Sequence, residues 1–142
     1  MNVNILHWYM PTEKEKLSIL SEMIAFAKVN NELRETEYDF LFSVAQQLEV
    51  SKKSFDSLFT QNVEHIIPKS QSDRIVQFHR LLLLMNVDNK QELIEIRRIH
   101  DIGLKMGLPP GAIQQVLIIM HKYPDKIVPP EMLIAIFKAH YN

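Results

Sequence analysis

The sequence predicts a single all-α domain, a bundle of about seven helices with two pseudo-repeated three-helix units. Its 142 residues fit one domain, and an apolar share of 46% supplies a core. The chain has only three glycines and seven prolines, too few for the frequent turns of an all-β protein. Between helix-capping signals, apolar residues recur every three or four positions, which is the spacing of one helix face.

The first unit spans about residues 12–60. Thr12 to Glu15 has the pattern of a capping box, so a helix begins there. A second helix begins near Glu35, and Ser51 caps a short third one. The expected inward-facing residues are Leu17, Leu20, Ile24 and Ala27, then Phe40, Leu41, Val44 and Leu48, then Phe55, Leu58 and Phe59. Pro68 keeps the stretch 61–69 out of a helix.

The second unit spans about residues 70–122, and a C-terminal helix covers about residues 129–140. Ser70 caps a long helix with an apolar surface nearly all round, so we expect this helix and residues 112–120 to form the middle of the bundle. A helix from about Leu93 ends at Gly107. In the C-terminal helix, the residues expected to face inward are Met132, Leu133, Ile136 and Phe137.

The two units align without a gap at an offset of 58 residues. Apolar positions of the first unit fall on apolar positions of the second, as Leu20 on Phe78 and Leu41 on Ile99. The pattern favours an internal duplication. The alternative is that any two amphipathic helical hairpins align in this way.

The loop between the first two helices carries the residues of a family resemblance. Residues 27–37, Ala-Lys-Val-Asn-Asn-Glu-Leu-Arg-Glu-Thr-Glu, are followed by an aromatic residue and Leu41. This segment resembles the helix-loop-helix element of the TerB-like tellurite-resistance family, in which Asp-Gly stands at the place of Asn30 and Asn31. The second unit keeps the aspartate as Asp88, followed by Asn89 and, after a further loop, Glu95.

The resemblance implies one TerB-like helical domain over residues 1–142. It further implies a role in stress response or in tellurite or metal resistance, exercised through protein complexes. Some members of that family bind divalent cations through acidic residues. From the resemblance we expect a non-enzymatic cytoplasmic protein-interaction module, and as the alternative a divalent-cation-binding regulatory domain.

Asp88, Glu95 and Glu37 are the candidate metal ligands. If the pseudo-symmetry brings them together, their carboxylates suit Ca²⁺ or Mg²⁺, which take oxygen ligands. The competing interpretation is structural. An aspartate at a helix end holds the turn, and a glutamate at the third helical position accepts hydrogen bonds from exposed N–H groups.

Several function classes lack support in the sequence. The absence of cysteine removes thiolate chemistry and cysteine-ligated metals, and the six histidines lack metal-ligand spacing. His79 and His100 are therefore expected to be partly buried and hydrogen-bonded. No nucleophile motif or phosphate-binding glycine loop occurs, so we expect neither an enzyme nor a cofactor. A net charge of −1 argues against nucleic-acid binding, and no apolar run is long enough for a membrane span.

Two features indicate a protein partner or a homo-oligomer. Before the first helix lie Ile5, Leu6, Trp8, Tyr9 and Met10, which either pack onto the bundle or anchor an interface. A modest basic patch near Arg97, Arg98 and Lys105 could meet an acidic partner.

Overall fold

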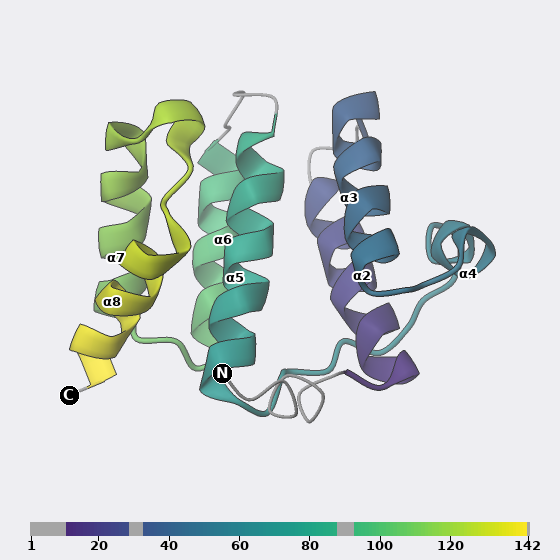
Figure 1. Cartoon of the computed structure of the whole chain (residues 1–142), viewed down its shortest axis with the longest axis horizontal. Coiled ribbons are helices and arrows are strands. Elements are labelled where there is room, and N and C mark those ends of the chain that lie inside the picture. The colour runs from purple at the N-terminus through teal and green to yellow at the C-terminus, as the bar shows by residue number, and fades with distance from the viewer. Residues whose placement is uncertain (1–10, 29–32, 88–92, 142) are drawn as a thin grey trace.

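The computed structural model describes residues 11–28, 33–87 and 93–141. These residues form seven α-helices, two short 3₁₀ helices and no strand, so the predicted all-α bundle is confirmed. The helices are α2 (Glu13–Ala27), α3 (Glu35–Gln47), α4 (Lys52–Ser57), α5 (Gln71–Asn86), α6 (Leu93–Lys105), α7 (Pro110–Ile119), η1 (Met120–Lys122), η2 (Pro124–Lys126) and α8 (Pro130–Tyr141). The long helices stand side by side, with α4 projecting beyond α3 at one end and α7 and α8 at the other (Figure 1).

Local sequence signals explain where the helices begin and end. Thr12 Oγ1 accepts a hydrogen bond from the Glu15 N–H at 3.2 Å, and Glu15 Oε1 accepts one from the Thr12 N–H at 2.8 Å. This is the predicted capping box. Ser51 and Ser70 cap α4 and α5 through their hydroxyl oxygens. Gly107 follows α6 with a φ of 80°, a conformation that glycine adopts without strain.

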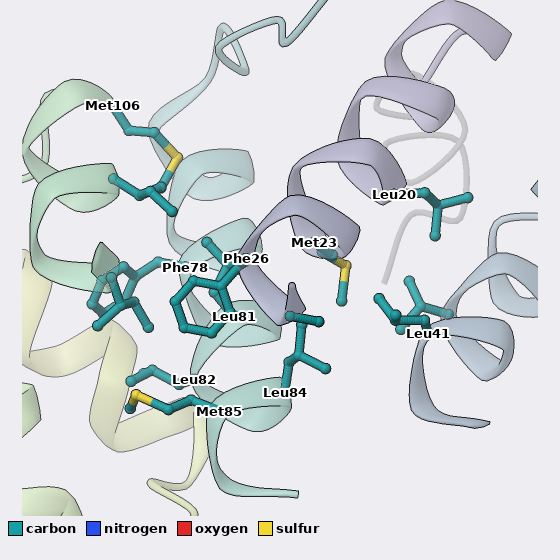
Figure 2. Packing of buried hydrophobic residues seen from close by; sticks show 14 of the residues in the cluster. Leu20, Met23, Phe26, Leu41, Phe78, Leu81, Leu82, Leu84, Met85 and Met106 are labelled. Atoms are coloured by element: carbon teal, nitrogen blue, oxygen red, sulfur yellow. The ribbon is translucent and has the colours of Figure 1, made fainter. Parts of the chain in front are cut away.

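The core is centred on α2 and α5, which pack against each other. α5 also contacts α3, α6 and α8, so its predicted central position is confirmed. Phe26 of α2 lies beside Phe78 and Leu81 of α5, while Met23 and Leu84 point toward α3 (Figure 2). These five side chains are at most 1% exposed. Burial of each contributes roughly 1.5–3 kcal/mol.

The expectation that residues 112–120 also lie in the middle of the bundle is wrong. α7 packs only on α6, α8 and η1 among the closely packed described elements, and it lies at the flank of the molecule (Figure 1). Its Ile118 side chain is 62% exposed, whereas Ile113 and Val116 are fully buried. An all-apolar run does not reveal which side of a helix the bundle covers, and here one side remains in solvent.

The helices of the two units begin 58 residues apart. α2 and α5 begin at residues 13 and 71, and α4 and α7 at 52 and 110; α3 begins at 35, and the described part of α6 begins at 93. The predicted offset therefore coincides with the helix boundaries. A common ancestor of the two units stays a prediction.

The irregular stretch 61–69 is attached to both central helices. The Ile66 N–H donates to Ser18 Oγ of α2 at 2.6 Å, and Arg74 Nε of α5 donates to the Pro68 carbonyl at 2.6 Å. These bonds satisfy backbone groups that no regular structure pairs. They also place the stretch as one wall of the clefts described below.

Candidate functional site

Two of the three predicted metal ligands lie within the described residues. Glu37 and Glu95 occupy the third positions of α3 and α6, and both helices start at the same end of the bundle (Figure 1). Glu37 is 5% exposed and Glu95 is 3% exposed. Asp88 lies outside the described residues. The structure therefore tests only part of the predicted constellation.

The Glu37 carboxylate acts as a helix cap. Its Oε1 accepts a hydrogen bond from the Arg34 backbone N–H at 2.9 Å, which is the structural role foreseen for a glutamate at this position. Glu95 is likewise a buried and partnered side chain. Over residues 11–28, 33–87 and 93–141, no three Asp, Glu or His side chains converge as a metal site. A site completed by Asp88 stays a prediction.

The histidines differ from the expectation in one respect. His79 is half-buried as predicted, but its Nε2 atom is buried without a hydrogen-bond partner. Burial lowers the pKa of His79, and the nearby Arg80 charge acts in the same direction. By contrast, His65 Nε2 lies 3.3 Å from Ser21 Oγ, and His140 Nε2 lies 3.0 Å from the side-chain oxygen of a glutamine on α7.

A cleft of about 310 Å³ lies where α2, α5 and residues 66–70 meet. Its apolar wall includes Ile19, Ile66 and Val76, and charged side chains surround it. Glu15, one of these, is engaged in the α2 cap, and Arg80 donates to the Gln77 amide oxygen at 3.1 Å. The Ser70 hydroxyl, which also lines the cleft, accepts from the Asp73 N–H and contacts Ser72 Oγ, so it is engaged in the α5 cap rather than paired with a base.

A second cleft, of about 230 Å³, contains part of the predicted basic patch. Arg98 and Lys105 of α6 line it, but so do the carboxylates of Glu22 and Asp101. The formal charges lining this cleft balance, because it has two carboxylates and two cations. The predicted attraction for an acidic partner is therefore weaker than the sequence pattern indicates.

The apolar surface of α8 extends beyond the part that the bundle covers. Leu133, Ile136 and Phe137 are buried, as predicted, but Met132 is 42% exposed, so the expectation that it faces inward is wrong. Ile134 is 49% exposed. Successive helical residues are rotated by about 100°, so Met132 and Ile134 flank the buried side on both edges. Sequence periodicity misses this surface because the buried and exposed apolar residues are neighbours.

Large apolar side chains of the second unit are also in solvent. Leu93 and Ile94 at the start of α6 are 63% and 48% exposed, and Ile118 of α7 is exposed as well. Among the described large apolar residues with substantial exposure, only Ile67 precedes α5. Exposed apolar surface therefore gathers in the second half of the chain.

Comparison with protein-family models, characterised proteins and solved structures finds no match to this chain. The likeness to the TerB-like family stays a prediction that rests on the two loop segments. No helix formed by the described residues is long and apolar enough to cross a bilayer.

Proposed function

We propose that this chain is a non-enzymatic, cytoplasmic protein-interaction module of the TerB-like kind, which binds a partner protein through α8. One observation carries the proposal: the apolar arc of α8 is wider than the bundle covers. Met132 and Ile134 remain exposed at its two edges. Exposed apolar side chains that flank a buried stripe favour contact with an apolar surface of another protein.

The predicted setting of this interaction is a stress or metal-resistance assembly. Support for that setting is the resemblance of the two loops to the TerB-like family. Support for a binding role over catalysis is chemical, because neither cleft pairs a nucleophile with a base among the side chains that line it. Family resemblance alone does not identify the partner.

Site-specific photo-cross-linking in the native cell tests the proposal. A photoreactive amino acid replaces Ile134 in one variant and the exposed Lys53 of α4 in a control variant. We expect a discrete cross-linked protein, either a second copy or another chain, at position 134 and not at position 53. Adding Met132→Glu to the first variant should weaken that cross-link. Equal labelling at both positions, or no effect of Met132→Glu, would contradict a specific surface on α8.

The alternative proposal is a regulatory domain that binds Ca²⁺ or Mg²⁺ through Glu37, Asp88 and Glu95. Its support is the burial of two of these carboxylates at one end of the bundle. Isothermal titration of each cation into the wild type and Asp88→Asn separates the alternatives. Heat of binding that disappears in Asp88→Asn supports a metal site. The absence of heat in the wild type rejects it.

A further inference from the structure

The side chain of His79 meets the chain segment that leads into α8. Its half-buried ring lies close to the backbone of Val128, two residues before Pro130 starts the helix. Val128 itself is only 3% exposed. Nε2 of His79 is buried, and no donor or acceptor reaches it. A neutral imidazole tolerates an acceptor nitrogen without a partner at a modest cost, but an added N–H there would be a buried, unsatisfied donor.

The neighbouring Phe78 holds the same part of the chain. Its ring packs edge-on against Phe137 of α8, with centroids 5.7 Å apart and planes at 80°. Directly before the segment, Asn86 Nδ2 donates to the Lys126 carbonyl at 3.3 Å. Residues 127–141 are therefore held at Lys126 and contact α5 through Phe78 and His79, while α8 also packs on α7.

We propose that His79 is an acid-sensitive latch for residues 127–141: protonation of its imidazole releases this segment from α5 and uncovers the buried side of α8. While the segment is docked, the added proton makes Nε2 of His79 a buried donor without an acceptor. In the released segment, water accepts from that N–H. The side uncovered contains Phe137, which packs on Phe78 and is distinct from the exposed residues of the proposed partner surface.

The charges around His79 favour release in acid. Among the described residues, Arg80 of α5 is the charged group whose field acts on His79, and it disfavours a second positive charge. No carboxylate from the described parts of α2, α3, α6 or α8 compensates it. The backbone of Val128 raises the pKa of His79, but burial lowers it by more, so the net shift is downward.

The sign of the pH dependence follows from proton binding. Burial holds the pKa of docked His79 below its ordinary value of 6.5, so the released form binds more protons. Above pH 6.5 the segment is docked at its full stability. Docking weakens as the pH falls from 6.5 toward the lower pKa that His79 has in the docked state. Uptake of one proton raises the opening constant by at most about tenfold per pH unit in that window.

Hydrogen exchange of the full chain at about pH 7.5 and 5.5, corrected for intrinsic exchange rates, tests the latch. We expect peptides from residues 127–141 to lose protection severalfold at the lower pH, while peptides from α2 keep theirs. His79→Phe and His79→Leu should remove this step. His121→Gln, which changes an exposed histidine on η1, should retain it.

Two results would overturn the latch: a wild-type pH step in a folded His79 variant, or an equal loss of protection in α2, which would show global unfolding. A second measurement uses the wild type alone, so it tests the latch even if His79→Phe and His79→Leu both misfold. Nuclear magnetic resonance titration of the His79 ring in the wild type should give an apparent pKa below 6.5, with a midpoint that matches the exchange step. A value at or above 6.5 would reject the proposal. None of these outcomes depends on a partner of α8.

Discussion

Glu49 at the end of α3 and Gly107 at the end of α6 adopt the same left-handed backbone conformation, with φ of 60° and 80°. The hydrogen bonds around them also correspond. The N–H of the following residue, Val50, donates to the Ala45 carbonyl at 2.9 Å, and the equivalent bond from Leu108 measures 3.0 Å. Both helices therefore end in the same turn, but only one has the residue that adopts it without strain.

Glu49→Gly is expected to stabilise the protein, and Gly107→Ala to destabilise it, each by about 1 kcal/mol. Glu49 is exposed, so its removal costs no buried contact. A Cβ at residue 107 would lie 3.5 Å from Arg74 Nη1, an ordinary contact, so strain alone decides the second effect. Urea unfolding followed by circular dichroism measures both. Changes of the same sign would show that the two turns are not equivalent.

These two turns show how far the sequence predicts the fold. Gly107 follows an apolar helical pattern and precedes two prolines, so the end of α6 is predictable from local signals. Glu49 carries no such signal, and only the offset of 58 points to its conformation. Likewise, Thr12 predicts the start of α2, whereas the exposed side of α7 depends on which neighbours the bundle supplies.

The candidate site was predictable to a smaller extent. The spacing that identifies Glu37 as a cap is local, and the structure confirms that role. Each cleft brings α2 together with segments distant in sequence: residues 66–70 and α5 at the first, His65, Ile67 and α6 at the second. His79 Nε2 is buried without a partner because of the path that residues 127–130 take past it. The spacing of apolar residues in the sequence does not predict that path.

Glu37→Ala is expected to lower the free energy of unfolding by about 1–2 kcal/mol, because the Arg34 N–H loses its acceptor. Glu35→Ala is the matched control: its side chain lies exposed in the same helical turn, and it should change stability much less. Thermal melting with and without Ca²⁺ measures the effect. An equal loss in both variants would argue against a specific cap.

Gly103→Ala is expected to destabilise the protein by about 1–3 kcal/mol through overpacking. The added Cβ would lie 2.7 Å from Ile113 Cδ1 and 3.2 Å from a ring carbon of Phe78. The equivalent position in the first unit, Ala45, already has this methyl group. The better helix propensity of alanine offsets only part of the cost, about 1 kcal/mol at most.

Ile113→Val removes the Cδ1 atom that the new methyl group would meet. The double variant should therefore lose less stability than the sum of the two single variants. A double-mutant cycle from chemical denaturation measures this coupling, expected at about 0.5–3 kcal/mol. Simple additivity would show that Gly103 tolerates a methyl group without displacing Ile113.

Asp56→Asn is expected to lower the pKa of Tyr38 toward its ordinary value. The Tyr38 hydroxyl donates to Asp56 Oδ1 at 2.8 Å, and this bond to a carboxylate raises the phenol pKa above 10.0. Lys52 Nζ donates to the other oxygen, Oδ2, at 2.6 Å, and these bonds hold the pKa of Asp56 below 3.8. Ultraviolet titration against a Tyr38→Phe reference isolates the Tyr38 signal from those of the other three tyrosines.

The same bond predicts how stability changes in alkali. A phenol pKa higher in the folded chain than in the unfolded one contributes stability below pH 10.0, which is lost as the pH rises through the folded value. The wild type should therefore lose more stability than Asp56→Asn between about pH 9 and 11. The difference should be small, because Lys52 and Asp56 are in contact with solvent and water screens their charges. Identical alkaline profiles, with an unchanged Tyr38 titration, would mean that the bond to Asp56 does not persist in solution.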